Sequence, residues 1–330
     1  MDTVRWGIIG VGDVTERKSG PGFQQADRSE LVAVMRRDGA KAADYARRHG
    51  VPRWYDDAEA LLRDPDVDAV YIATPPDSHR DYALRALAAG KPVYVEKPMA
   101  RTTAECEEML AAAARAGLPL FVAYYRRAMP RFARVKELLD GGAIGRVNAF
   151  RVENFRTAPG ADEQVSWRLR PEVSGGGLFV DLASHTLDVL DYLLGPVTRA
   201  RGGALNVSGL SLAEDTVTGT FEVGSAVVGT GLWCYAAGEQ RDLVEIIGTA
   251  GSLEFSSFGQ EPLRLRTATG VEEIEAPYPP TVQQPLIQAV VDELTGVGSS
   301  PSTGASAVRT AKVVDALLAQ YRAEHGITFE

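Results

Sequence analysis

The 330-residue sequence has few of the residues that staple small proteins or bind metals. Its two cysteines, Cys106 and Cys234, cannot form a framework of disulfide bridges and fit a reducing compartment. The four histidines are scattered, so no cluster at metal-ligand spacing exists. No apolar run reaches the ~18 residues of a membrane span, and no apolar signal core follows the N-terminus. We therefore expect a cytoplasmic protein that binds no metal and no membrane.

An excess of basic residues is also lacking. Lysine and arginine total 35 against 44 aspartates and glutamates, which gives a formal net charge of -9. An acidic chain without a basic run is poorly suited to a phosphate backbone, so a nucleic-acid partner is disfavoured. The length of the chain corresponds to two domains at roughly 150 residues each.

The first 123 residues alternate short apolar runs with segments rich in alanine, leucine and arginine. The apolar runs cover 4–9, 31–35, 69–73, 93–95 and 120–123, and helical patterns cover 40–49, 58–62, 78–89 and 102–116. Continuously apolar strands separated by helices are typical of a parallel sheet covered on both faces. The sequence therefore predicts an α/β domain over 1–123 with a doubly wound parallel sheet of the Rossmann type.

Beyond residue 123 the pattern changes to longer runs of alternating polarity. These runs cover 146–155, 197–207, 216–222, 226–235 and 243–248, with helical segments at 178–194, 285–295 and 305–323. Many alternating strands beside few helices indicate an α+β domain on a large open, mostly antiparallel sheet. We expect this second domain over 124–330, with a C-terminal helix that can pack back on the first domain.

A glycine-rich turn closes the first predicted strand. Gly10 and Gly12 would let the backbone turn tightly, so that amides of this turn and of Asp13 and Val14 face a pyrophosphate. The usual third glycine is replaced by Thr15, so the fingerprint is incomplete, and a tight turn without a ligand is the alternative. The segment KSGPG at 18–22 should break the first helix.

The end of the second strand bears on the choice of cofactor. A carboxylate at this place would bind the ribose of NAD, but the sequence has Arg36 and Arg37. Guanidinium groups suit a 2′-phosphate by charge and bidentate geometry, so NADP(H) is favoured and NAD(H) remains possible. Asp38 fits an N-cap of the next helix. The alternative is that both arginines are merely solvated.

Two further strand ends carry polar residues where ligands of doubly wound sheets bind. Thr74 and Pro75 follow the run 69–73 and are candidates for cofactor contact, together with His79, for which a capping role in the turn is favoured over that of a base. Glu96 and Lys97 follow the run 93–95, where charged groups are costly unless paired or used. We expect Lys97 to donate to a substrate oxygen; a Glu96–Lys97 surface pair is the alternative.

The helical segment 178–194 supplies candidate groups from the second domain. At about 100° per residue, Asp181, His185 and Asp188 share one narrow stripe, and a glycine run precedes them. Imidazole titrates near neutrality, and a neighbouring carboxylate can orient it or hold substrate, which suits proton transfer. A solvent-facing polar stripe is the alternative.

Several of these segments together resemble one family. The sequence is similar to the glucose–fructose oxidoreductase, inositol dehydrogenase and rhizopine-catabolism superfamily over nearly its whole length. The resemblance rests on GIIGVGDV at 7–14, ATPPDSH at 73–79, EKP at 96–98, SWR at 166–168 and GGGLFVDLASHTLD at 175–188. It implies a Rossmann domain followed by an open-sheet substrate domain, and hydride transfer between a nicotinamide and a hydroxyl or carbonyl carbon of a sugar, cyclitol or related polyol.

The resemblance also implies roles for individual residues. Lys97 matches the catalytic lysine, His185 the usual acid/base, and Asp181 an assisting carboxylate. The residues that match segments near substrate are Tyr125, Arg126, Trp167 and Arg168, for which packing and surface charge are the alternatives. An open sheet has a face that related proteins cover by pairing subunits, so a homo-oligomer, dimer or tetramer, is expected.

The resulting hypothesis is a reversible, metal-free hydride transfer at a secondary alcohol or its ketone. Two other functions remain open from the sequence: a cofactor-binding regulator without turnover, and a glycosidase that uses tightly held NAD through transient oxidation.

Overall fold

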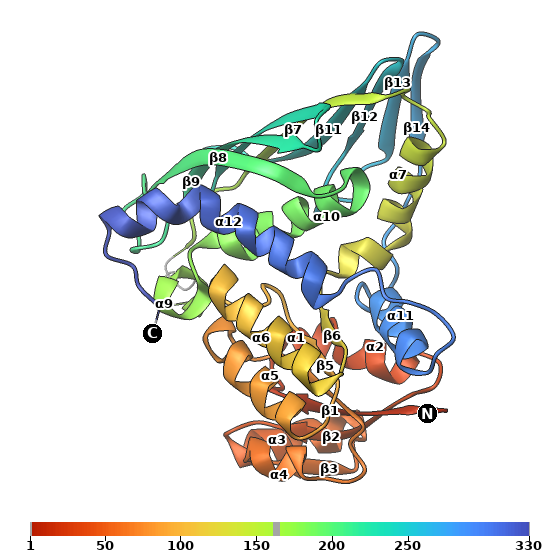
Figure 1. Cartoon of the computed structure of the whole chain (residues 1–330), viewed down its shortest axis with the longest axis vertical. Helices are drawn as coiled ribbons and strands as arrows, with labels where there is room; N and C mark the ends of the chain where they lie inside the picture. Colours follow the sequence, from red (N-terminus) through yellow and green to blue (C-terminus); the bar gives the residue numbers. More distant parts are fainter. Residues whose placement is uncertain (1, 161–165, 330) are drawn as a thin grey trace. The chain divides into compact units, whose positions relative to one another are not determined.

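The computed structural model describes residues 2–160 and 166–329, which form two compact units. The first unit comprises Met1–Met129 and Pro279–Val308, and the second comprises Pro130–Tyr278 and Arg309–Glu330 (Figure 1). The segment Pro279–Val308 thus folds with the N-terminal part of the chain, although it follows the strands of the second unit.

The first unit is built on a six-stranded parallel sheet. Its order is β3-β2-β1-β4-β5-β6, so the strand order reverses direction beside β1, as in doubly wound folds. The strands are β1 (Val4–Ile9), β2 (Ser29–Met35), β3 (Arg53–Tyr55), β4 (Ala69–Ile72), β5 (Val93–Val95) and β6 (Leu120–Val122). The predicted parallel sheet is confirmed; the short β3 has no buried residue and left no apolar run in the sequence.

Helices connect these strands, and local chemistry sets where they begin and end. They are α1 (Asp13–Arg17), α2 (Gly20–Gln25), α3 (Gly39–His49), α4 (Ala58–Leu62), α5 (His79–Ala88), α6 (Thr103–Ala116) and the later α11 (Gln284–Leu294). Asp38 caps α3 by accepting from the Lys41 amide at 3.2 Å, as predicted. The predicted break of the first helix lies between α1 and α2, and α2 packs against α11.

The second unit is built on an eight-stranded sheet in the order β14-β13-β12-β11-β7-β10-β9-β8. Only β7 and β10 pair in parallel, so the predicted mostly antiparallel sheet is confirmed. The strands are β7 (Val147–Phe155), β8 (Val197–Leu205), β9 (Thr216–Val223), β10 (Val227–Cys234), β11 (Arg241–Gly248), β12 (Gly251–Phe255), β13 (Leu263–Thr267) and β14 (Gly270–Ile274).

Helices cover one face of this sheet. They are α7 (Pro130–Asp140), α10 (Ser184–Leu194) and α12 (Gly304–Glu324). The short helical turns are η1 (Pro76–Ser78) and η2 (Tyr125–Ala128) in the first unit, and η3 (Trp167–Leu169) and α9 (Pro171–Ser174) in the second. A Cβ at Gly202 or Gly219 would lie 2.7 or 3.2 Å from Leu317 of α12, so glycine lets this helix approach β8 and β9. From Arg309 onward the C-terminal helix therefore belongs to the second unit.

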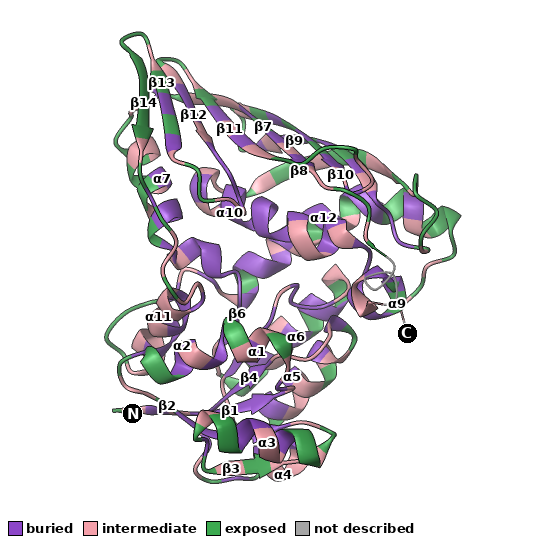
Figure 2. Ribbon diagram, turned by 180° about the vertical axis from the view of Figure 1, so that it is seen from behind, coloured by how far each residue is buried: buried purple, intermediate pink, exposed green. Residues whose placement is uncertain are grey.

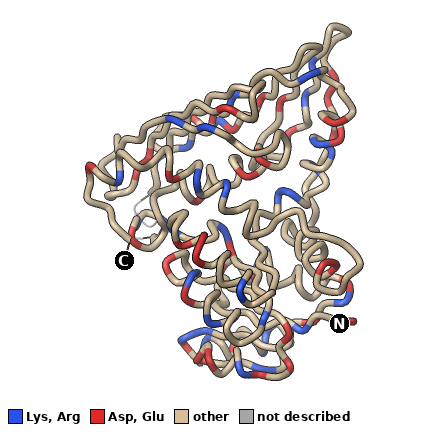
Figure 3. The backbone as a smooth tube through the Cα atoms, in the orientation of Figure 1, with Lys and Arg blue, Asp and Glu red and all other residues tan. Residues whose placement is uncertain are grey.

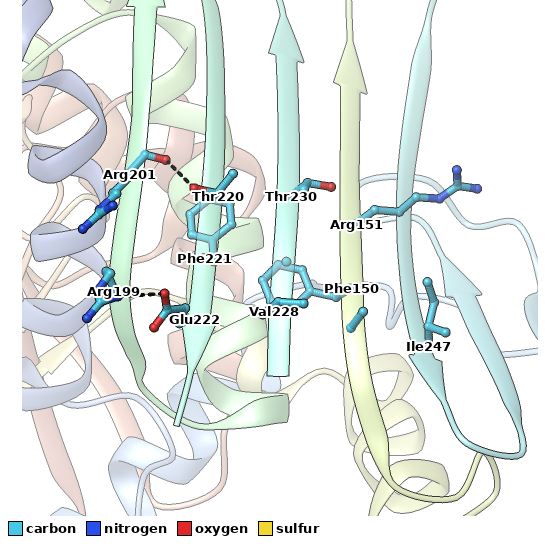
Figure 4. Close-up of a pocket in the computed structure, with 12 residues that line it drawn as sticks. Phe150, Arg151, Arg199, Arg201, Thr220, Phe221, Glu222, Val228, Thr230 and Ile247 are labelled. Carbon is cyan, nitrogen blue, oxygen red and sulfur yellow. Dashed lines mark hydrogen bonds and ion pairs between the residues drawn. The ribbon is translucent and has the colours of Figure 1, made fainter. Parts of the chain in front are cut away.

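The two faces of the sheet differ in burial, as the alternating colours of β9 and β10 show (Figure 2). The covered face holds buried aromatic side chains, among them Phe150, Phe221 and Trp233. The other face is open and carries a shallow hollow of about 500 Å³ between Arg199, Val228 and Ile247 (Figure 4). Strand alternation thus separates a packed core from an accessible outer face.

Charged side chains of both signs are interspersed along the chain (Figure 3). Many form surface ion pairs, such as Arg5 with Asp68 at 2.8 Å and Arg48 with Glu16 at 2.5 Å. No helix in the described part of the chain is long and apolar enough to cross a membrane.

Candidate active site

The glycine turn after β1 is fitted closely to the strand beside it. Gly10 has φ +96°, and a Cβ there would lie 2.6 Å from the Thr74 side chain, so only glycine suits this position. Thr15 accepts from the Gly12 amide at 2.9 Å and donates to the Gly12 carbonyl at 2.8 Å. The residue that departs from the glycine fingerprint therefore closes the first turn of α1. The space where a Cβ of Gly12 would stand is open, which fits a dinucleotide passing close to the backbone.

The amides of the glycine turn are hydrogen-bonded within the protein, which differs from the expectation that they face a pyrophosphate. The amides of Gly10 and Val11 donate to the Met35 carbonyl at 2.9 and 3.2 Å, and that of Gly12 donates to Thr15. The first-turn amides of Asp13 and Val14, which a helix leaves without intrahelical acceptors, remain the better candidates to face an anion.

Arg36 and Arg37 follow β2, at the edge of this turn. Arg36 is half-buried and donates to the Val11 carbonyl at 3.1 Å, whereas Arg37 is exposed. Two guanidinium groups therefore follow the second strand, one of them held against the glycine turn.

His79 joins the segments that follow β4 and β5. Its side chain is fully buried, with Nδ1 3.0 Å from the Pro98 carbonyl and Nε2 2.7 Å from the Thr74 carbonyl. Burial lowers the pKa of His79, although both carbonyl groups act in the opposite direction. These contacts fix the turn that contains Thr74 and Pro75.

Glu96 fixes the backbone of Lys97 at the end of β5. The Glu96 carboxylate accepts from Tyr71 at 2.5 Å, from the Gln283 side chain at 2.8 Å and from the Lys97 amide at 3.0 Å. Glu96 is buried, and burial together with its charge raises the pKa of Tyr71 far above its usual range. The carboxylate is thus satisfied inside the unit, and the Lys97 side chain is half-buried.

Tyr125 lies in the same unit, close to several cations. Burial would raise the pKa of Tyr125, but the charges of Arg126, Lys18 and Lys97 outweigh it and lower the pKa. The Arg126 guanidinium stands 5.0 Å from the centre of the Tyr125 ring. Tyr125, Arg126 and Lys97 therefore form one electropositive cluster.

In the second unit, Asp181 forms an ion pair with Arg168. Arg168 Nε lies 3.3 Å from Asp181 Oδ2, and the guanidinium stacks 4.5 Å from the Trp167 ring centre. The structure thus brings together three residues that the sequence assigned separately to substrate binding and catalysis.

His185 stands in the first turn of α10 and is buried. The His185 ring packs edge to face on the Phe258 ring, with 6.1 Å between the ring centres. The Arg156 guanidinium lies 5.0 Å from the centre of the same Phe258 ring. His185 therefore sits in an enclosed position of the second unit, where a change of charge is costly unless a partner compensates it.

The predicted single α-helix over 178–194 is wrong in its first turn. Residues Phe179–Ala183 form a π-helix and α10 begins at Ser184, so a rotation of 100° per residue does not apply from Asp181 to Asp188. Asp188 is fully buried and accepts from Thr310 of α12 at 3.3 Å. A solvent-facing polar stripe is therefore excluded, and Asp188 connects two helices.

Comparison with known proteins agrees with this architecture. A model described as "Oxidoreductase family, NAD-binding Rossmann fold" matches residues 4–124, and a model of the GFO/IDH/MocA C-terminal domain matches residues 132–254. The chain belongs to the GFO/IDH/MocA family. The resemblance expected from the glycine turn, EKP and GGG segments is thereby confirmed.

Individual relatives of this GFO/IDH/MocA chain match nearly end to end. Oxidoreductase P35 of Formosa agariphila is 38% identical over 315 residues, covering 94% of this chain and 97% of the relative. The 1,5-anhydro-D-fructose reductase of Ensifer adhaerens is 30% identical over 310 residues, covering 92% of each chain. The solved structure of levoglucosan dehydrogenase with NADH and levoglucosan has a TM-score of 0.87 at 24% identity and covers 98% of both chains.

These matches establish the class of this GFO/IDH/MocA protein. It is an oxidoreductase with an NAD(P)-binding Rossmann unit, so the expected enzyme class is confirmed. In the described part of the chain, no group of three or more His, Cys, Asp and Glu side chains is arranged to hold a metal ion.

Sequence reasoning missed several structural partners of the candidate residues, among them Gln283, Phe258 and Glu214. Gln283 follows the second-unit strands by only a few residues, so nothing in the sequence placed it beside Glu96. Phe258, against His185, lies in a turn without periodic pattern. The acidic pair Glu214 and Asp215 immediately precedes β9, whose residues alternate in burial, and this pair at a strand entrance was the signal that the sequence offered for Glu214.

Proposed function

We propose that the chain transfers hydride between a nicotinamide and a secondary alcohol, or its ketone, of a sugar, cyclitol or related polyol. Family membership supports the redox class, and the names of 1,5-anhydro-D-fructose reductase and levoglucosan dehydrogenase support a carbohydrate-like substrate. The observation that carries the proposal is the fixing of Lys97, through its own amide and Glu96, at the carboxyl end of β5. Ligands of doubly wound sheets bind outside this end.

Each candidate group has a role that follows from its chemistry. During oxidation of an alcohol, His185 accepts the hydroxyl proton, while the Lys97 ammonium donates to the same oxygen and stabilises developing negative charge. Asp181, paired with Arg168, orients His185 or a neighbouring substrate hydroxyl. The bound nicotinamide supplies the hydride acceptor or donor. Tyr125, Arg126, Trp167 and Arg168 are the proposed substrate contacts.

The proposed cofactor is NADP(H), with NAD(H) as the alternative. Arg36, held against the glycine turn, and exposed Arg37 offer two positive charges to a 2′-phosphate. Gly10, Gly12, Asp13 and Val14 are proposed at the pyrophosphate, and Thr74, Pro75, His79, Glu96 and Lys97 near the nicotinamide half. The functional division into a cofactor domain (1–123) and a substrate domain (124–330) belongs to the same proposal.

We also propose that the protein is a homo-oligomer that pairs through the open face of its second sheet. Val228 is 59% exposed and Ile247 37%, beside ion pairs such as Arg199–Glu222 that a second copy can complement (Figure 4). The cytoplasm is the proposed compartment, because Cys106 and Cys234 form no disulfide bridge.

The test of the function is Lys97→Met, assayed with a panel of sugars, cyclitols and keto-sugars and both nicotinamide cofactors. We expect kcat to fall by roughly two to four orders of magnitude with cofactor affinity retained. Lys91→Met is the matched control, since Lys91 stands at the other end of β5 and donates to the carbonyls of Asp64 and Val67.

Three results would contradict the proposal. Near-normal kcat in Lys97→Met would reject the assigned role. Cofactor binding without turnover on any substrate would favour the regulator. Release of sugar without net cofactor reduction would favour the glycosidase.

A further inference from the structure

Glu214, at the end of the loop between β8 and β9, is buried against the glycine run that precedes the π-helix. Its side chain is almost inaccessible, and Oε1 accepts from the Gly177 amide at 2.8 Å. A Cβ at Gly176 would lie 2.8 Å from Glu214 Oε1, and one at Gly177 would lie 2.4 Å from the Glu214 carbonyl oxygen. Gly177 is therefore required by the Glu214 backbone, whereas a Cβ at Gly176 would meet the Val180 side chain, at 2.5 Å, as well as the Glu214 carboxylate.

The turn held by Glu214 leads directly into the segment that carries the candidate groups. The Gly177 carbonyl accepts from the Asp181 amide at 3.2 Å, and the π-helix then continues into α10 with His185. On the other side of the turn, Arg322 of α12 donates to the Gly175 carbonyl at 2.7 Å. Two charged side chains thus hold one short turn, through its amide and its carbonyl.

We propose that Glu214 is a positioning residue for Asp181 and His185, and that its ionisation tunes how firmly this turn is held. The inference rests on the proposed function for the catalytic importance of Asp181 and His185, but not for the positioning itself. Glu214 acts through Gly177, and no contact with substrate or cofactor is assigned to it.

The surroundings of Glu214 make its charge state sensitive to neutral pH. Burial raises the pKa of Glu214 to about 7, against the hydrogen bond from Gly177 and the positive charge of Arg322. The other titratable groups that interact with it are Asp215 on its own loop, Tyr235 after β10 and Tyr321 on α12. Glu214, Asp215 and Tyr235 also line a cavity of about 10 Å³, room for about one water.

The two charge states hold the turn differently. A carboxylate accepts the Gly177 amide in a charge-assisted hydrogen bond, which is stronger than the bond to a neutral acid. Burial nevertheless outweighs this hydrogen bond and raises the pKa, so ionisation favours release of the side chain, and the turn is held less firmly above pH about 7 than below it.

Four variants test the inference in the full-length protein. Glu214→Gln retains an oxygen that accepts from the Gly177 amide but does not titrate. Glu214→Ala removes this acceptor, and Glu214→Asp has a side chain one methylene shorter, which moves the carboxylate away from the Gly177 amide. Asp215→Asn is the matched control, since Asp215 accepts from the Val207 and Ser208 amides and not from the glycine turn.

The first readout is amide hydrogen exchange of a peptide spanning 175–185, which needs no substrate. Measured below pH about 7, where Glu214 is mostly protonated and resembles glutamine, exchange should speed up in Glu214→Ala and Glu214→Asp and stay near wild type in Glu214→Gln and Asp215→Asn. Unchanged exchange in the alanine and aspartate variants would overturn the positioning role. If Glu214→Ala does not fold, Glu214→Asp decides this point.

The second readout is kcat/KM for the polyol between pH 5.5 and 9. The ratio of wild type to Glu214→Gln should be near one at low pH and fall about fivefold as the pH rises through about 7, because only the wild-type side chain ionises there. KM for the cofactor should stay within about twofold. A kcat/KM ratio that does not change with pH would overturn the effect of Glu214 ionisation, whatever the result for Lys97→Met. Normal kcat in Lys97→Met would contradict the proposed function but not the positioning role of Glu214.

Discussion

Glu214 should make the stability of the protein depend on pH in a way that one substitution removes. Its pKa is about 7 in the folded chain against 4.5 for an ordinary glutamate, a difference of about 2.5. At 1.36 kcal/mol for each pKa unit, ionised Glu214 costs about 3 kcal/mol of folding free energy. Because the pKa is raised, the more stable state is present below pH about 4.5 and is lost as pH rises through about 7.

The difference in unfolding free energy between Glu214→Gln and wild type isolates this effect. Measured by urea unfolding between pH 5.5 and 8.5, the variant should gain about 2 kcal/mol of stability relative to wild type as pH rises, because the rest of the difference develops below pH 5.5. Burial raises the pKa of Asp215, but hydrogen bonds from Val207 and Ser208 outweigh it and lower the pKa. Asp215→Asn should therefore give a nearly flat difference, apart from the small effect of its charge on Glu214. A flat difference for Glu214→Gln would refute the reasoning.

Three other predictions concern the cofactor, the helix pair and the sheet face. Replacing both Arg36 and Arg37 with alanine should raise KM for NADPH at least about tenfold more than KM for NADH; equal effects would reject the 2′-phosphate assignment. Arg309→Met removes the bidentate partner of buried Asp191 (2.8 and 2.6 Å) and should cost about 2 kcal/mol in urea unfolding, whereas an unchanged midpoint would show that the pair contributes nothing. Val228→Arg should shift the mass in analytical ultracentrifugation to that of a monomer, and a monomeric wild type would contradict pairing through this face.

The local sequence was sufficient for most of the fold. Apolar runs such as 4–9 and 93–95 correspond to buried strands, because both faces of a covered parallel sheet are buried and its strands are therefore apolar at successive positions. The cap at Asp38 and the break at 18–22 also followed from local chemistry, since they depend on neighbouring backbone groups only. The strands β12–β14 were missed because they are short and their outer residues are charged.

The candidate groups of each unit were found from the positions of charged residues at strand ends and in the helix after the glycine run. Their partners were not, because these partners come from distant parts of the chain. Gln283 reaches Glu96 across 187 residues, and Thr310 reaches Asp188 across 122. No periodicity carries information over such separations.

The sequence by itself determined the family, the parallel and antiparallel sheets, and the residues Lys97, Asp181 and His185 as candidates, since each rests on a motif or on the period of a strand. Only the tertiary structure showed that the segment 178–194 begins with a π-helix and that Asp181 pairs with Arg168. It also placed Glu214 beside Gly176 and Gly177. The reason is physical: helix period and burial of a charge depend on what packs against them, and packing partners are chosen by the whole fold.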